Sequence, residues 1–302
     1  MEKKENKKDF KFGTVAVIGK ANVGKSTIIN HLMGYKVSIV TPKPETTRNR
    51  ITAILTTNDA QIVFIDTPGI HKAKTLLGRN MVRNARETLD DIDCLVCVFD
   101  MVKKISPEDE NIVRIIRASD VPKIAVINKI DKRKKALALP LIEQISDMNG
   151  FDEIIPVSAE KGDNMPELLE NIIRVLPRGE RMYPDDYVTN KTMRFMVGEI
   201  IREKALICTR QEIPHALAVF VEDFEERPDK DVLYVRATVY VERQSQKKIV
   251  IGRKGEMLKR IGSMARREME LFVDKKVYLD IWVKVYPNWR KDPRALKKLE
   301  YL

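Results

Sequence analysis

The sequence predicts a doubly wound α/β domain with a mostly parallel sheet, followed by a smaller α+β domain. Apolar runs alternate with helical patterns between residues 14 and 176, which is typical of parallel strands joined by crossover helices. After residue 191 the order becomes helix, two strands, helix and strand. The intervening stretch is rich in proline, glycine and charge and has no periodicity. We therefore expect a flexible tail at 1–12, a first domain at 13–178, a linker at 179–191 and a second domain at 192–302.

A glycine loop follows the first strand, an apolar run at 14–18. The loop fits the pattern G-x-x-x-x-G-K-[ST] and leads into helical spacing. A tight turn with an incidental lysine would read the same, but the order strand, loop and helix favours an anion site, because backbone N–H groups and a helix N-terminus then face the phosphates. Lys25 would reach the outer phosphates and Ser26 would hold Mg²⁺. The residues assigned to the phosphates are Gly19, Asn22, Val23, Gly24, Lys25, Ser26 and Thr27.

The next two strands, at 51–55 and 62–65, follow a loop at 41–50 that contains two prolines and several hydroxyls. The second of these strands ends in Asp66-Thr67-Pro68-Gly69. Asp66 stands where it can meet the Mg²⁺ held by Ser26, and the backbone N–H of Gly69 can approach a terminal phosphate. An ordinary turn would have the same letters, but the preceding phosphate loop favours the nucleotide interpretation.

Three further strands are expected at 95–99, 124–127 and 154–157, and helices at 76–89, 108–118, 137–148 and 165–176. The middle strand ends in Asn128-Lys129-Ile130-Asp131, and the last ends at Ser158-Ala159. A carboxylate at Asp131 accepts hydrogen bonds from the ring N–H and the exocyclic amine of guanine, and adenine offers no such pair. Ser158 and Ala159 are placed for backbone contact with the base. All four motifs follow strands, so they should meet at the carboxyl edge of the sheet.

This ordered set of motifs resembles a translation-factor-class GTPase of the P-loop type. The resemblance implies GTP and GDP as ligands, with Mg²⁺. It also implies that Thr47, or else Thr46, closes onto Mg²⁺ when the third phosphate is present, and that 41–50 and the segment after Gly69 are switches. The catalytic candidates are Lys25, Thr47 and Asn22.

One position departs from the common pattern. Ile70 stands where many GTPases carry a glutamine that orients the attacking water, so slow intrinsic hydrolysis is expected. In similar GTPases the asparagine of G-x-x-N-V-G-K-S helps to bind K⁺, which makes Asn22 a candidate K⁺ ligand.

The second half contains one motif, Ile251-Gly252-Arg253-Lys254-Gly255. We expect helices at 192–209 and 256–272 and strands at 215–221, 232–241 and 277–285. A lone G-x-x-G is usually a turn, but this one lies in 243–276, which holds 11 basic and 4 acidic residues. That context favours nucleic acid over a solvated basic face. The residues assigned to RNA are Gly252, Arg253, Lys254, Gly255, Lys259 and Arg260; Ile249, Ile251 and Leu258 are either groove walls or core.

This module resembles a type II K-homology domain, whose G-x-x-G loop clamps single-stranded RNA. The whole chain resembles the Era family of GTPases. The resemblance implies binding near the 3′ end of small-subunit ribosomal RNA and a role in maturation of the small ribosomal subunit. An alternative is an RNA-binding scaffold that holds nucleotide with negligible turnover. A partner enzyme in tRNA modification is a third interpretation, but 181–302 shows no second catalytic constellation.

The composition narrows the setting of these functions. The chain has 302 residues, a net charge of +11 and three cysteines, and the odd cysteine number argues against a disulfide scaffold. Cys94 and Cys97 form a C-x-x-C inside a buried-strand pattern, which favours core packing over a zinc site. The three histidines have no ligand or nucleophile neighbour in sequence. We expect a cytoplasmic monomer with no membrane span or secretory signal, and the basic second domain leaves peripheral membrane contact open.

Overall fold

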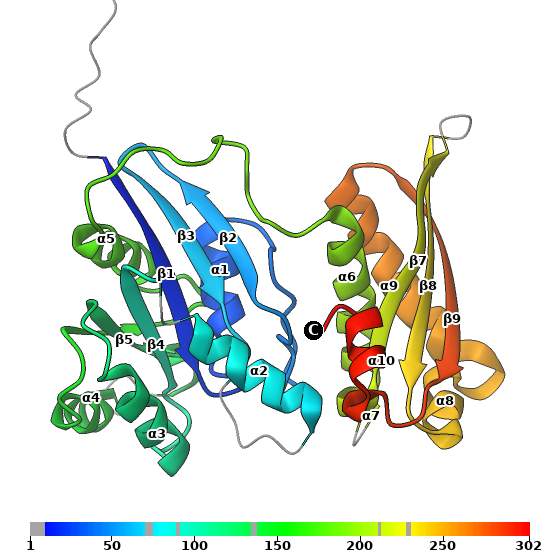
Figure 1. The fold of residues 1–302 in the computed structure, drawn as a ribbon, viewed down its shortest axis with the longest axis horizontal. Helices are drawn as coiled ribbons and strands as arrows, with labels where there is room; N and C mark the ends of the chain where they lie inside the picture. Colours follow the sequence, from blue (N-terminus) through cyan, green and yellow to red (C-terminus); the bar gives the residue numbers. More distant parts are fainter. Residues whose placement is uncertain (1–9, 70–74, 89–90, 134–137, 211–212, 228–230) are drawn as a thin grey trace, which may run out of the picture. The chain divides into compact units, whose positions relative to one another are not determined.

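The computed structural model describes residues 10–69, 75–88, 91–133, 138–210, 213–227 and 231–302 (Figure 1). The chain divides into two compact units. The first takes its described residues from 1–38, 47–72 and 81–190, and the second takes them from 39–46, 73–80 and 191–302. Two short segments from the first half of the sequence thus belong to the second unit.

The first unit is built on a six-stranded sheet with the strand order β2-β3-β1-β4-β5-β6. β2 is antiparallel to β3 and every other neighbouring pair is parallel. This confirms the predicted doubly wound, mostly parallel sheet. The strands are β1 (Lys11–Gly19), β2 (Ile51–Thr56), β3 (Ala60–Asp66), β4 (Cys94–Asp100), β5 (Lys123–Asn128) and β6 (Glu153–Val157).

Helices cover both faces of this sheet, which explains the continuous apolar runs of its strands. Val15 and Val17 of β1 pack with α1 and α5 in one core, and Ala16 and Ile18 pack with α3 and α4 in the other. Alternate residues of β1 therefore stabilise opposite layers, and each fully buried valine or isoleucine side chain contributes about 1.5–3 kcal/mol. The helices are α1 (Lys25–Met33), α2 (Leu76–Glu87), α3 (Pro107–Ile116), η1 (Ile130–Lys132), α4 (Ala138–Asp147) and α5 (Met165–Val175).

The expected tail and linker are partly ordered. Lys11 and Phe12 already belong to β1, where their backbone pairs with β3, while residues 1–9 lie outside the described residues. Residues 188 and 189 lie along the free edge of β2: the Ile54 N–H donates to the Val188 carbonyl at 2.9 Å, and the Thr189 hydroxyl donates to the Thr52 carbonyl at 2.7 Å. The polar composition of this stretch is typical of a linker, but the open edge of β2 supplies its backbone with partners.

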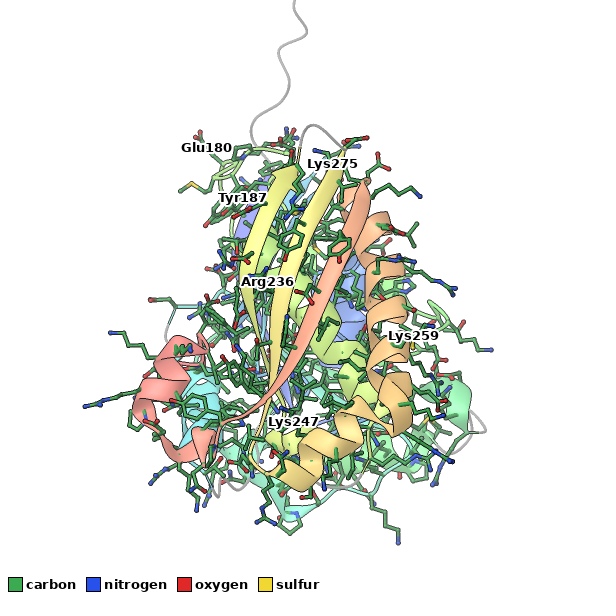
Figure 2. All side chains as sticks on the ribbon, turned by 90° about the vertical axis from the view of Figure 1, so that its right-hand side faces the viewer. Glu180, Tyr187, Arg236, Lys247, Lys259 and Lys275 are labelled. Carbon is green, nitrogen blue, oxygen red and sulfur yellow. The ribbon has the colours of Figure 1, made fainter. Side chains whose placement is uncertain are left out.

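The second unit contains a three-stranded sheet with the order β7-β8-β9. β7 is antiparallel and β9 is parallel to the central β8. α6 and α9 pack on one face through residues such as Ile201 and Ile261, and Figure 2 looks onto the other face. The elements are α6 (Met193–Cys208), α7 (Ile213–Ala216), β7 (Ala218–Arg227), β8 (Val232–Val241), α8 (Gln244–Ile251), η4 (Arg253–Gly255), α9 (Glu256–Val273), β9 (Lys276–Val285), η5 (Trp289–Lys291) and α10 (Pro293–Lys298).

In the second unit one expectation is wrong, and one helix was not predicted. His215 lies in the short helix α7 and the strand begins only at Ala218. Pro214 suits a first helical turn because it lacks an N–H. Residues 244–251, for which the sequence predicted no element, form α8, and at its start the Arg243 N–H donates to Oε1 of Gln246 at 2.9 Å. Its single fully buried side chain, Val250, gives too little apolar periodicity to identify a helix.

The two cysteines of the C-x-x-C are core residues, as predicted. Cys94 and Cys97 are buried in β4 and are free thiols. Burial raises the pKa of both thiols, that of Cys94 to about 12. The described residues hold no group of three or more His, Cys, Asp or Glu side chains that could bind a metal. In that same part of the chain, no helix is long and apolar enough to cross a membrane.

Candidate active site

The phosphate loop lies between β1 and α1, at the carboxyl edge of the sheet. Gly24 has a φ of 104°, and a Cβ at this position would lie 2.1 Å from Nδ2 of Asn128. Only glycine meets both conditions. Gly69 is also required to be small, because a Cβ there would lie 2.7 Å from the backbone nitrogen of Ala21. Gly24 and Gly69 belong to separate motifs, and each is required because another residue of the site lies too close for a side chain.

Lys25 is held inside the loop. Its Nζ donates to the carbonyls of Gly19 at 3.1 Å and Lys20 at 2.9 Å, and the residue is only 6% exposed. Burial lowers the pKa of Lys25 to about 8, an effect that the nearby Asp66 opposes. A buried ammonium at the N-terminus of α1 is suited to the outer phosphates of a nucleotide.

Three oxygen-bearing side chains meet beside Lys25. The Ser26 hydroxyl donates to Oδ2 of Asp66 at 2.6 Å and lies 2.9 Å from the Thr47 hydroxyl. Because a serine hydroxyl has one proton, Thr47 is the donor to Ser26. Burial raises the pKa of Asp66, and its Oδ1 is buried with no hydrogen-bond partner among the described residues.

This oxygen set fits Mg²⁺, which prefers carboxylate and hydroxyl ligands together with water and phosphate. A buried carboxylate oxygen without a partner is a ready ligand for such an ion. Thr47 belongs to the set, whereas the Thr46 hydroxyl is bonded to Thr41 at 2.7 Å and to the Lys43 carbonyl at 2.7 Å. The geometry thus favours Thr47 over Thr46, the two threonines that the sequence left as alternatives.

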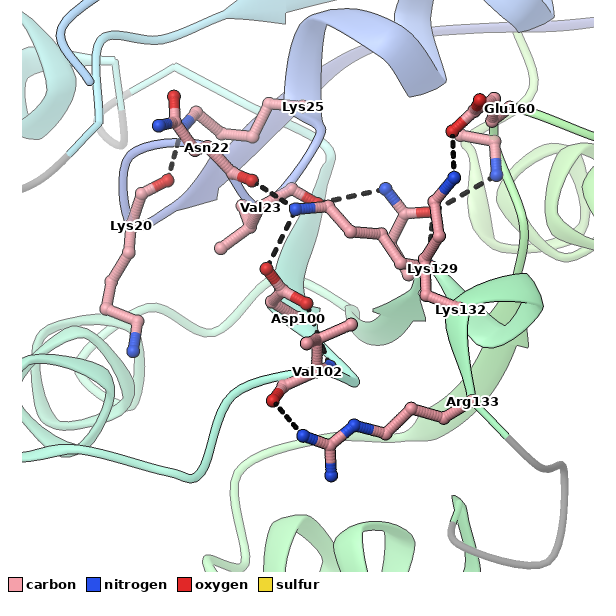
Figure 3. Close-up of polar contacts among 12 residues, drawn as sticks. Lys20, Asn22, Val23, Lys25, Asp100, Val102, Lys129, Lys132, Arg133 and Glu160 are labelled. Atoms are coloured by element: carbon pink, nitrogen blue, oxygen red, sulfur yellow. Dashed lines mark hydrogen bonds and ion pairs between the residues drawn. The ribbon is translucent and has the colours of Figure 1, made fainter. Parts of the chain in front are cut away.

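The base-recognition motifs form one hydrogen-bonded network with the loop (Figure 3). Nδ2 of Asn128 donates to the Val23 carbonyl at 2.9 Å, and its Oδ1 accepts from the Ala159 N–H at 3.0 Å. Nζ of Lys129 donates to the Asn22 carbonyl at 2.6 Å and to Asp100 at 2.8 Å. These bonds join the phosphate loop to the strand ends that would hold the base.

Asp131, the residue assigned to guanine, is oriented by its neighbours. Oδ1 accepts from the Ser158 hydroxyl at 2.7 Å, and Oδ2 lies 3.2 Å from Nζ of Lys132. Burial alone would raise the pKa of Asp131, but the hydrogen bonds from Ser158 and Lys132 outweigh it and lower the pKa. The carboxylate is therefore held ionised, which is the form that accepts two hydrogen bonds from guanine.

Sequence reasoning missed Asp100, although the signal was present. Asp100 ends β4 at the edge where Asp66 ends β3, and it is buried beside Lys129. It also missed Lys20, which pairs with Asp109, because residues 89 positions apart have no local pattern. Ile70 and His71, in contrast, lie outside the described residues.

The second unit includes residues 39–46, which overlap the first part of the expected switch at 41–50. In that unit the Val40 N–H donates to Oε1 of Glu203 at 2.9 Å, and Nη2 of Arg202 donates to the Thr46 carbonyl at 2.5 Å. Glu45 lies 3.2 Å from Nδ1 of His215. Arg202 is 1% exposed and is paired with Glu199. A buried cation therefore binds the backbone of segment 39–46 at Thr46.

The glycine loop of the second unit is displayed between α8 and α9. Gly252 and Gly255 have φ values of 76° and 81°, and Lys254 between them has a φ of 49°. The side chains assigned to RNA are exposed: Arg253, Lys254, Lys259 and Arg260. Figure 2 shows Lys247 on α8 and Lys259 on α9. Ile249 is 48% exposed, while Ile251 and Leu258 pack partly against the core.

Known protein families match both parts of the chain. A family described as "50S ribosome-binding GTPase" matches residues 14–129, and a family described as "KH domain" matches residues 212–290. GTPase Era of Halothermothrix orenii is 44% identical over 97% of this chain and 99% of its own length. GTPase Era of Syntrophus aciditrophicus is also 44% identical, over 97% and 95% respectively.

Solved structures agree with these relatives. A crystal structure of Era in complex with MgGDPNP and nucleotides 1506–1542 of 16S ribosomal RNA has a TM-score of 0.94 at 41% identity, covering 97% of this chain and 99% of that one. A single-residue variant of Aquifex aeolicus Era bound to GDP and AlF₄⁻ has a TM-score of 0.93 at 42% identity, with the same coverage. On the motifs, the fold and these relatives together, the chain belongs to the Era family of GTPases.

Proposed function

We propose that this GTPase is a switch that binds single-stranded ribosomal RNA through its second unit and assists maturation of the small ribosomal subunit. The similar Era crystallised with 16S ribosomal RNA supports the RNA part. The exposed basic residues around Gly252–Gly255 supply charge for the backbone of such a ligand. The partner would be the small ribosomal subunit, and the chain would act as a cytoplasmic monomer. The proposed domain limits are 13–178 for the GTPase and 192–302 for the K-homology domain, joined by 179–191.

The contacts of two adjacent residues, Thr46 and Thr47, support the proposed switch. Thr46 is held by Arg202 inside the second unit, and the next residue, Thr47, has its hydroxyl bonded to Ser26 inside the first. A change at Thr47 must therefore be transmitted along one peptide bond to a residue that Arg202 grips. If Thr47 moves with the third phosphate, the state of the nucleotide biases the second unit.

In the proposed mechanism each residue of the first unit has a separate task. Ser26, Thr47 and Asp66 would hold Mg²⁺, which neutralises phosphate charge when it is bound. Lys25 would place its ammonium on the outer phosphates, and Asn128, Asp131, Ser158 and Ala159 would hold the guanine. Lys129 supports this site by joining the Asn22 carbonyl to Asp100.

We also propose K⁺ as a cofactor, bound beside Asn22. It would compensate for the water-positioning glutamine of other GTPases, whose position is occupied by Ile70 in this chain. Exchange of K⁺ for Na⁺ at constant ionic strength should slow phosphate release, because the smaller ion does not fit the same oxygen set. An unchanged rate would remove K⁺ from the mechanism.

Reciprocal affinities test the switch directly. RNA affinity is measured in the GDP and GTP-analogue states, and GTP-analogue and GDP affinities are measured with and without RNA. Thermodynamic linkage requires the two ratios to be equal. Equal RNA affinities in both nucleotide states would reject the switch. Multiple-turnover phosphate release with and without RNA then separates the switch from a scaffold, which would release negligible phosphate in both cases.

A further inference from the structure

A buried ion pair fastens the phosphate loop to the start of α3. Nζ of Lys20 lies 2.5 Å from Oδ2 of Asp109 and 3.0 Å from the Ser106 hydroxyl. The side chains of Lys20 and Asp109 are 11% and 4% exposed. Lys20 is the first residue after Gly19, so this pair acts on the loop itself and not on a flanking helix.

The two ends of Lys20 serve different partners. Its carbonyl accepts the hydrogen bond from Nζ of Lys25 at 2.9 Å. Its side chain runs away from Lys25, toward α3 (Figure 3). The direction of the Lys20 carbonyl, and with it the place of the Lys25 ammonium, is therefore tied to Asp109.

We propose that Lys20 and Asp109 are positioning residues for the nucleotide phosphates. They act through the loop: they hold the peptide unit that joins Lys20 to Ala21 in the orientation that places Lys25. A loop that must present several N–H groups to one anion loses affinity steeply when a peptide turns, because every contact depends on the same backbone.

Stability alone does not account for the pair. A buried ion pair contributes little net stability, because the two charges lose their hydration. The helix cap of α3 is complete without Lys20, since Asp109 already accepts from the Ser106 N–H and hydroxyl, both at 2.9 Å. The cap of α3 therefore does not need Lys20. The structural effect of Lys20 that remains is to hold the phosphate loop.

A second carboxylate, Asp100, also holds the phosphate loop. Asp100, at the end of β4, holds Lys129, which donates to the Asn22 carbonyl. Asp100 and Asp109 therefore act on the loop at positions 22 and 20, one through Lys129 and one through Lys20. The end of β4 and the start of α3 thus each supply one carboxylate that holds the phosphate loop.

The test uses the double variant K20M/D109N in the full chain. It removes both charges together, so no unpaired buried charge remains, and the introduced amide still offers an oxygen to the cap. The matched control is R290M/E242Q, which removes the Arg290–Glu242 pair (2.6 Å) in the second unit. K20R keeps the cation and should keep the function.

Affinities for GMP, GDP and GTP are measured at a temperature at which all variants are folded. We expect K20M/D109N to weaken GDP and GTP by about tenfold relative to GMP, because only the longer nucleotides use the positioned Lys25. K20R and the control should keep the wild-type ratios. An equal loss for all three nucleotides, or a lowered melting temperature with unchanged ratios, would overturn the proposal and leave the pair a structural role only.

Discussion

The Ser26 hydroxyl donates a 2.6 Å hydrogen bond to Oδ2 of Asp66, and this contact joins the phosphate-loop helix to the end of β3. The two residues are 40 positions apart, and each comes from a motif of its own. Their meeting supports one Mg²⁺ site built from two motifs, with Thr47 as the third member.

The substitution D66N tests this site. Asparagine keeps the shape and still accepts from Ser26, but it lacks the charge that a divalent ion requires. We expect the slowing of GDP dissociation by Mg²⁺ to fall by about tenfold or more, since a charge-assisted contact is worth about 1.5–3 kcal/mol. Dissociation of a fluorescent GDP analogue with Mg²⁺ and with EDTA measures it. D93N, at a carboxylate that caps the Thr14 N–H instead, is the control, and an unchanged Mg²⁺ effect in D66N would contradict the site.

Base choice should change with D131N. The amide offers one donor and one acceptor where the carboxylate offers two acceptors, so guanine loses one bond and faces a donor. We expect GDP affinity to fall by about 100-fold, from the loss of about 3 kcal/mol. Xanthosine diphosphate, which carries a carbonyl in place of the exocyclic amine, should gain affinity. Competition against a fluorescent nucleotide measures both, and retained GDP preference would show that Asp131 does not read the base.

The hydrogen bond from Arg202 to the Thr46 carbonyl should be required for coupling between the bound nucleotide and RNA affinity. In R202M/E199Q the cation and its buried partner are neutralised together, which avoids an unpaired charge. We expect RNA affinity in the GDP state to remain within about twofold of wild type. The ratio of RNA affinities between the GTP-analogue and GDP states should fall toward one from the roughly 5–150-fold that is typical of coupled sites. Unchanged coupling would place the switch elsewhere than at 39–46.

RNA binding through the loop should be recognised from its salt dependence. Arg253 and Lys254 are exposed, so each substitution R253A and K254A removes one cation with little loss of stability. For single-stranded RNA each lost contact should lower the slope of log K against log salt by about 0.7. K161A, in the first unit, is the control. If the slope stays the same in both loop variants, the loop does not contact the RNA backbone.

The buried thiols give a prediction about pH. The raised pKa of Cys94, about 12 against 9.0 in an unfolded chain, means that the native state keeps a proton that the unfolded state loses. Stability from this thiol is therefore complete below about pH 9 and is lost as pH rises toward 12, at about 1.4 kcal/mol per pH unit.

Urea unfolding at about pH 8 and pH 10.5 measures this loss. C94A should lose less stability between the two pH values than wild type does, and C208A should show a smaller change of the same sign, because burial also raises the pKa of the partly exposed Cys208 thiol. In the native protein at pH about 8 only the partly exposed Cys208 should react with a thiol reagent, because Cys94 and Cys97 remain protonated and buried. Rapid native reaction of all three would contradict the buried sites.

The sequence by itself determined the sheet, the order of its motifs and the kind of nucleotide that they suit. Strand ends carry those motifs, and parallel strands bring their carboxyl ends to one edge, so local patterns such as Gly19–Ser26 and Asn128–Asp131 were enough. For the same reason the sequence predicts that Asp66 and Ser26 share one ion, and their hydroxyl–carboxylate contact agrees with that prediction.

Tertiary structure alone decided which residues support that site. The pair Lys20–Asp109, the bond from Arg202 to Thr46 and the place of residues 188 and 189 along β2 join residues far apart in sequence. His215 entered α7 instead of a strand because its short context carries no decisive period. Ion pairs and edge pairings depend on which surfaces folding brings together. The spacing of residues along the chain does not predict these contacts.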